Sequence, residues 1–300
     1  MDKLVEREAA ARNPLTAAPA IAVQFFIIPL LVIGATVLVY VGFRSLLTED
    51  RSAQEYLTDI QSGGSNRRWP AAYELSRLMG DPQFVKKEQA VLAPQLIKAF
   101  AASGDDDPRL RQYLALALGR LTPPIPAEAR RLLVEALNDK ESQTRISAIW
   151  ALGSTGDLTV APEIERMYQS DDAGVRKMTV YALGSLPGEV GTATLVKALD
   201  DAEPDVQWNA AVALARHGRH EGVNVLRRML DRDYVQRVVT RQQQATDDID
   251  PVGEVMITGL RAIAALKESS LSEPVKALSQ ADKNLKVREA ATETLRTING

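Results

Sequence analysis

The chain has 300 residues, of which 45% are hydrophobic and 25% are charged, a composition that is ordinary for a folded protein. It contains no cysteine, which excludes disulfide bonds, thiolate catalysis and zinc sites built from cysteine ligands. The formal net charge is −3, whereas nucleic-acid-binding domains are usually basic, so the composition disfavours that class of function.

A polar tail, residues 1–20, precedes an uncharged apolar segment, residues 21–43, which reads IAVQFFIIPLLVIGATVLVYVGF. At 1.5 Å per residue this segment could cross a hydrocarbon core of roughly 30 Å. RSLLTED follows it instead of a small-residue cleavage site, which favours a retained transmembrane helix over a cleaved signal peptide. Three basic residues precede the segment and two follow it closely, so the positive-inside rule places the C-terminal domain outside the cytoplasm.

Residues 44–65 are predicted to be a linker. The stretch SGGSNRRWPAAYELSRLMG, residues 62–80, overlaps its end and can be interpreted in two ways. A glycine-rich turn before Arg67 and Arg68 could bind phosphate, or the stretch could be the first copy of a structural repeat. The rest of the chain favours the repeat.

A helical motif recurs along residues 66–300. Its clearest copies are LRQYLALALGRL from Leu110, TRISAIWALGST from Thr144, VRKMTVYALGSL from Val175 and VQWNAAVALARH from Val206. One slot of the motif holds Arg or Gln at 111, 145, 176 and 207, with spacings of 34, 31 and 31 residues. Weaker copies place Arg68, Met256 and Arg288 in the same slot.

Segments with apolar residues at i, i+3, i+4 and i+7 alternate with these copies, for example PAEARRLLVEALND from Pro126. The unit is therefore a helix–turn–helix that must stack on its neighbours to bury its apolar face. The sequence predicts an all-α fold, an α-solenoid preceded by a single transmembrane helix. An arginine in the slot could bond an acidic residue or a loop carbonyl of an adjacent repeat, and we expect a structural ladder of Arg68, Arg111, Arg145, Arg176 and Arg288.

The motif V-R-x-x-A-x-x-A-L-G, with an acidic residue just upstream, resembles HEAT-like repeats of the phycobilisome-lyase type over residues 66–300. The whole plan also resembles bacterial membrane-anchored HEAT-repeat proteins, which implies a single-pass protein of the bacterial inner membrane. Neither resemblance carries a reaction to this chain.

Candidate chemical sites are few. His217 and His220 lie in one glycine-containing turn, and no third histidine or cysteine is available to complete a usual zinc site. We expect solvated turn residues there, and no metal, cofactor, catalytic residue or small-molecule substrate.

The repeat spacing lengthens to 49 residues between Gln207 and Met256, and we assign the excess to an insertion at about residues 231–251. Insertions in solenoids often map to the binding face. Seven arginines fall between residues 216 and 241, and aspartates follow them. A solvated excursion is one interpretation, and contact with a charged partner is another. On the second interpretation the partner-binding residues are Arg227, Arg228, Tyr234, Arg237 and Arg241.

The predicted function is a membrane-anchored scaffold or adaptor that binds a protein partner, for example as an accessory to a membrane complex such as a transporter. Two alternatives stay open at this point. One is a repeat-containing lyase or isomerase, and the other is nucleic-acid binding through residues 216–241.

Overall fold

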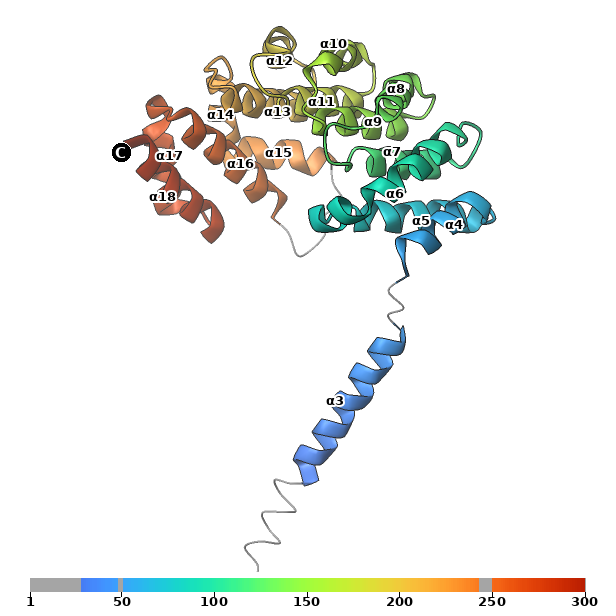
Figure 1. Cartoon of the computed structure of the whole chain (residues 1–300). Coiled ribbons are helices and arrows are strands. Elements are labelled where there is room, and N and C mark those ends of the chain that lie inside the picture. Colours follow the sequence, from blue (N-terminus) through green and yellow to red (C-terminus); the bar gives the residue numbers. More distant parts are fainter. Residues whose placement is uncertain (1–27, 48–50, 243–249, 300) are drawn as a thin grey trace, which may run out of the picture. The chain divides into compact units, whose positions relative to one another are not determined.

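The computed structural model describes residues 28–47, 51–242 and 250–299. The chain divides into two units, Met1–Ser52 and Ala53–Gly300. All regular elements of the described residues are helices (Figure 1). The predicted all-α fold and the helical-repeat solenoid are confirmed.

The predicted membrane span is contradicted. In the first unit, helix α3 runs from Ile28 to Leu47, and residues 21–27 of the predicted span lie outside the described residues. Within the described residues, the uncharged part of α3 runs from Ile28 to Phe43 and extends roughly 24 Å at 1.5 Å per residue, whereas a hydrocarbon core is about 30 Å thick. Across the described residues, no helix combines the length and the apolar character that crossing a membrane requires. The predicted single-pass localisation in the bacterial inner membrane is therefore wrong.

Seven helices of the second unit carry the repeat motif, and we call them the motif helices. Each of them packs against the next along the chain. They are α5 (Ser65–Leu78), α7 (Pro108–Leu118), α9 (Ser142–Ser154), α11 (Ala173–Leu183), α13 (Pro204–Arg216), α16 (Pro251–Leu266) and α18 (Leu285–Asn299).

The remaining helices of this unit flank the motif helices, and α8, α10 and α12 lie along one side of α9, α11 and α13 (Figure 1). The flanking helices are α4 (Ala53–Ser62), α6 (Pro82–Ala101), α8 (Ala127–Glu135), α10 (Ala161–Arg166), α12 (Thr192–Ala198), α14 (Val223–Met229), α15 (Arg232–Gln242) and α17 (Ser272–Ala281). Short 3₁₀ segments lie at Ala136–Asn138, Leu158–Val160, Met167–Gln169 and Ser269–Leu271.

Successive motif helices approach closely where a glycine at the end of one meets an alanine of the next. A Cβ atom added at Gly184 would lie 2.3 Å from the Cβ of Ala213, and one added at Gly153 would lie 2.7 Å from the Cβ of Ala182. These alanines are buried and occupy one repeat position. Gly184, the C-cap of α11, has a φ of −70°, which other residues also adopt, so its role is to allow close packing. The left-handed conformation occurs later in the turn, at Gly188, whose φ is 81°.

Helix α13 is the boundary between two buried clusters of apolar side chains. Val206, Ala213 and Leu214 belong to a cluster that begins at Leu57. Trp208, Ala211 and Ala215 of the same helix belong to a second cluster, which extends to Ala291. The regular packing of the preceding repeats therefore changes at α13.

Two segments differ from the predicted organisation. The predicted linker, residues 44–65, includes helix α4, whose Leu57 and Ile60 are fully buried. The predicted insertion, residues 231–251, includes helix α15, whose Val235, Val238 and Val239 are buried. Apolar residues three and four positions apart share one face of a helix, and that face is buried here. Residues 243–249 lie outside the described residues.

Candidate partner-binding site

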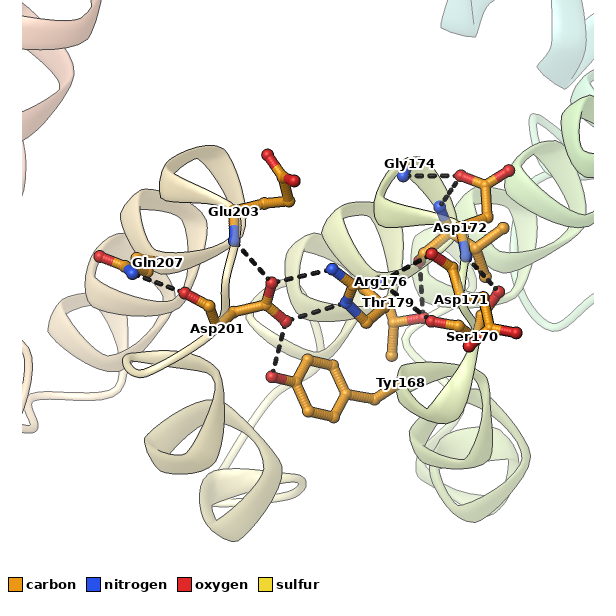
Figure 2. Close-up of polar contacts among 11 residues, drawn as sticks. Tyr168, Ser170, Asp171, Asp172, Gly174, Arg176, Thr179, Asp201, Glu203 and Gln207 are labelled. Atoms are coloured by element: carbon orange, nitrogen blue, oxygen red, sulfur yellow. Dashed lines mark hydrogen bonds and ion pairs between the residues drawn. The ribbon is translucent and has the colours of Figure 1, made fainter. Parts of the chain in front are cut away.

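The slot arginine of α11 lies in a dense polar network (Figure 2). The Nε and Nη2 atoms of Arg176 donate to the two carboxylate oxygens of Asp201 at 2.9 and 3.0 Å. Its Nη1 donates to the carbonyls of Ser170 and Asp171, and the hydroxyl of Tyr168 donates to Asp201 at 2.9 Å. The Asp201 side chain is only 4% exposed. This guanidinium joins the turn before its own helix to the turn before the next motif helix.

The other slot arginines have related partners. Arg68 donates to Asp106 at 2.5 Å and Arg111 to Asp139 at 2.5 Å. Arg145 donates to the carbonyl of Asp139 and Arg288 to that of Asp282, at 2.8 and 2.6 Å. Arg145 and Arg288 each reach six residues back, as Arg176 does toward Ser170. These contacts engage the guanidinium groups within the fold and leave them poorly placed to bind a ligand.

Burial and hydrogen bonding together determine the pKa values of the ionisable groups in the network. Burial raises the pKa of the Asp201 carboxyl, but hydrogen bonds from Arg176, the Glu203 amide and Tyr168 outweigh it, so the pKa lies below its ordinary value. Burial, with the hydrogen bond to Asp201, raises the pKa of Tyr168 to about 12. Asp201 is therefore held as a carboxylate and Tyr168 as a neutral donor. This arrangement is structural, since both groups are committed to each other.

The structure brings together two of the five predicted partner-binding residues. The Nη2 of Arg228 donates to Oε1 of Gln207 at 3.0 Å, and its guanidinium lies 5.9 Å from the Tyr234 ring centroid. Tyr234 meets Trp208 edge to face at 6.3 Å. Arg227 and Arg237 are exposed, and Arg241 lies in α15 with its side chain outside the described residues.

One arginine that the sequence did not single out is structural. Arg232 begins α15 and donates to both carboxylate oxygens of Asp282, at 2.9 and 2.7 Å. It also lies 3.4 Å from Asp250, which in turn accepts from Asn284 at 2.6 Å. These bonds attach α15 to the starts of α16 and α18. In the sequence, the signal for these bonds was an arginine outside the repeat slot, Arg232, followed by aspartates further along the chain.

The two histidines have separate partners. The Nε2 of His217 lies 3.2 Å from the carbonyl of Leu186, which makes it the donor, and the Nδ1 of His220 lies 2.7 Å from the Glu268 carboxylate. The turn therefore directs the two rings to different neighbours. His220 is not merely solvated, because it links this turn to the segment before α17.

A pocket of about 460 Å³ lies where α11, α13, α15 and α16 meet, and we call it the break pocket because the repeat period breaks there. Its volume falls within the range of about 300–1,000 Å³ that is usual for ligand pockets. The apolar lining comes from Met178, Val212, Met229, Val239 and Val255.

Two aromatic side chains complete the lining of the break pocket. Tyr181 of α11 is 40% exposed, whereas Trp208 of α13 is 5% exposed. The indole Nε1–H of Trp208 has no hydrogen-bond partner among the described residues, and the nitrogen is itself covered. We therefore assign Trp208 a packing role in the pocket wall, and Tyr181 is the aromatic group that a bound molecule can reach.

Charged residues of both signs line the break pocket. Lys177 and Asp205 form an ion pair at 3.3 Å, at the starts of α11 and α13. Near the ends of these helices the Arg216 guanidinium lies 5.9 Å from the centroid of the Tyr181 ring, so α11 and α13 run parallel. Among the residues that the structure describes, neither Arg216 nor Glu254 has an ion-pair partner. Both are exposed at the pocket.

The break in the period did point to this region, but the predicted partner-binding residues with described side chains do not line the pocket, namely Arg227, Arg228, Tyr234 and Arg237. Lys177 and Met178 follow the slot arginine of α11, and Trp208 and Asn209 follow the slot glutamine of α13. These are the variable positions of the motif, so the repeat pattern itself carries no signal for them. The signal that could have found them is a run of large side chains at variable positions beside the lengthened spacing.

Comparison with known proteins identifies the repeat. The family model of HEAT repeats matches residues 93–184 and 164–245, which together span more than half of the 300 residues. None of the curated proteins matches the chain.

Solved structures of helical repeats are similar to the chain. The complex of CpcE and CpcF of phycocyanin lyase from Nostoc sp. PCC7120 has 17% identity and a TM-score of 0.51, and the match covers 83% of this chain and 94% of that chain. An archaeal HEAT-like repeats protein from Thermococcus onnurineus NA1 has 14% identity and a TM-score of 0.43, covering 83% and 97%. A designed armadillo repeat protein in complex with the peptide (KR)4 has 18% identity and a TM-score of 0.39, covering 83% and 100%. The likeness to the CpcE and CpcF complex is, at 17% identity, one of fold.

Proposed function

The chain belongs to the HEAT repeat family, and we propose that it acts as a protein-binding module whose partner docks on the break pocket. One observation carries this proposal. The pocket presents tyrosine, methionine and arginine, residue types that are enriched in protein–protein interfaces, and tryptophan packs in its wall. Their aliphatic neighbours supply apolar area, and the exposed Tyr181 ring supplies a rigid contact surface.

The lining of the pocket favours a protein over a nucleic acid. Asp205 and Glu254 contribute negative charge to it, whereas a nucleic-acid groove requires an excess of positive charge along the backbone. Two arginines of the region 216–241 pair with carboxylates of the fold, Arg219 with Glu221 and Arg232 with Asp282. The positive charge of this region is therefore partly neutralised.

An enzymatic role has less support from this geometry. The strongly coupled carboxylate of the second unit, Asp201, is 4% exposed at its side chain and is bonded to Arg176 and Tyr168. It does not line the break pocket. General acid or base catalysis needs an ionisable group within reach of a substrate. The two carboxylates that line the pocket, Asp205 and Glu254, come from different helices, and Asp205 is paired with Lys177.

Site-specific photo-crosslinking in the full chain tests the proposal. A benzophenone side chain replaces Thr258, which is exposed and lines the pocket, and in a control it replaces Asn224, which is exposed on the flanking helix α14. We expect a discrete crosslinked polypeptide at position 258 in a lysate of the source cells, and none at position 224. The change Val212→Glu should reduce that product at least about tenfold, because it places an unpaired charge against the apolar anchor. Equal crosslinking at both positions would refute docking at this pocket.

A further inference from the structure

A second hollow continues from the break pocket across the motif helices. It has a volume of about 640 Å³ and is lined by α16 and α18, with Arg261, Lys286 and Glu289 among its residues. Glu254 lines both hollows and therefore lies at their junction. Two hollows in series over four successive motif helices, α11, α13, α16 and α18, fit an elongated molecule better than a compact one.

Some charged side chains of the break pocket have an ion-pair partner and others have none. Lys177 and Asp205 neutralise each other at 3.3 Å. Arg216 faces only the ring of Tyr181, and Glu254 has no ion-pair partner among the residues in the described ranges. In the break pocket a bound molecule therefore meets one unpaired cation and one unpaired anion beside an apolar cavity. In the second hollow Arg261, Lys286 and Glu289 also have no ion-pair partner among the described residues.

The two unpaired charges lie at different levels along the helices. Glu254 and Asp205 each stand two residues before the slot residue of their own motif helix, Met256 and Gln207, so they occupy equivalent levels. Arg216 lies eleven residues after Asp205, which is roughly 16 Å along the axis of α13. A chain in extended conformation covers that distance in about five residues.

We propose, building on the protein-binding function above, that the two hollows bind an extended polypeptide segment with an apolar anchor residue flanked by one acidic and one basic residue. The anchor occupies the break pocket against Met178 and Val212. The acidic residue faces Arg216, and the basic residue faces Glu254, about five residues away. The methionines of the pocket can adapt to several anchor shapes, so charge order, more than anchor identity, determines which segment binds.

Selection from a random peptide library displayed on phage tests this charge code on the full chain. Wild type should enrich peptides that carry one acidic and one basic residue on either side of an apolar anchor. Arg216→Glu should enrich peptides with basic residues on both sides, and Glu254→Lys should enrich peptides with acidic residues on both sides. These outcomes do not depend on the direction in which the peptide runs. Arg237→Glu is the matched control, because Arg237 is exposed but does not line either hollow.

Binding of the selected wild-type peptide then gives the size of the effect. Its dissociation constant should rise roughly three- to tenfold with Arg216→Glu, and replacing the acidic residue of the peptide by lysine should reverse that loss. The effect should shrink as salt is raised, since exposed charges are screened. The Arg237→Glu variant should bind the peptide as wild type does.

Three results would overturn the charge code: no enrichment, enrichment of the same peptides by all variants, or selected peptides that bind Val212→Glu as tightly as wild type. If a partner still crosslinks at position 258 in that case, the protein-binding function stands and only the charge code is lost. If no partner crosslinks, the proposed function itself fails.

Discussion

Replacing Gly184 by alanine is expected to push α11 and α13 apart. The new Cβ would lie 2.3 Å from the Cβ of Ala213 and 2.9 Å from its Cα. Carbon atoms in favourable contact are about 3.5–4.0 Å apart, so the helices must separate locally by roughly 1.2 Å or more. Overpacking of this kind typically costs about 1–3 kcal/mol. The better helix propensity of alanine offsets up to about 1 kcal/mol, so we expect a net loss of about 1–2 kcal/mol.

Urea unfolding of the full chain, followed by circular dichroism, measures this change. Gly104→Ala is the matched control, because no atom lies within 4 Å of a Cβ added there, and it should alter stability by less than about 0.5 kcal/mol. Combining Gly184→Ala with Ala213→Gly removes the clashing methyl from the other helix. The two changes should therefore couple favourably by at least about 1 kcal/mol. Strictly additive effects, or an unchanged midpoint for Gly184→Ala, would refute the close seam.

Three further changes test the packing and the polar network. Ala182→Leu should cost about 1–3 kcal/mol in the same measurement, because its side chain is buried in a seam between motif helices, and unchanged unfolding would mean that the register is misplaced. Val235→Ala should cost on the order of 1–2 kcal/mol, since the valine is fully buried in α15, whereas Arg237→Glu should leave the urea midpoint unchanged; equal effects would contradict packing of that helix. Asp201→Asn should cost on the order of 2–3 kcal/mol at neutral pH. Because the folded-state pKa of Asp201 is lowered, this advantage of wild type should be complete above the ordinary aspartate pKa of about 3.9 and should decline as pH falls further, and a pH-independent difference would refute it.

The central repeats could be predicted from the sequence because their pattern and their packing have the same cause. Ala151, Ala182 and Ala213 recur at one position, and each meets a glycine of the preceding motif helix. A close helix contact tolerates only small side chains, so the constraint is visible in one sequence. The regular spacing of 31 residues between Arg145, Arg176 and Gln207 follows from the same stacking.

Segments off the period were harder to predict. Leu57 and Ile60 of α4, and Val235 with Val239 of α15, show helical spacing, yet no copy of the repeat motif includes them. Assigning off-period residues to a linker or an excursion ignored that local spacing. The membrane prediction failed for a different reason, because hydropathy counts apolar residues but does not require that they lie in one helix of sufficient length. No helix of the described residues meets that requirement.

The position of the break pocket follows from how a repeat stack must change when an extra helix is inserted. Each motif helix packs against its successor along the whole series, including α13 against α16 and α16 against α18. Helix α15 enters between α14 and α16, and its Val239 then lines the pocket beside Met229 and Val255. The same pocket is lined by variable positions of α11 and α13, which the repeat consensus does not constrain.

The charges at the break pocket differ in how the fold engages them. Elsewhere in the second unit half-buried cations are paired, as Arg176 is with Asp201 and Arg232 with Asp282. At the break pocket Lys177 and Asp205 are paired, whereas Arg216 and Glu254 are exposed and have no ion-pair partner among the residues described. Exposed charges at the rim of an apolar cavity add little to the stability of the fold, but they discriminate strongly between partner surfaces. The break in the repeat period thus provides a surface that can distinguish one partner from another.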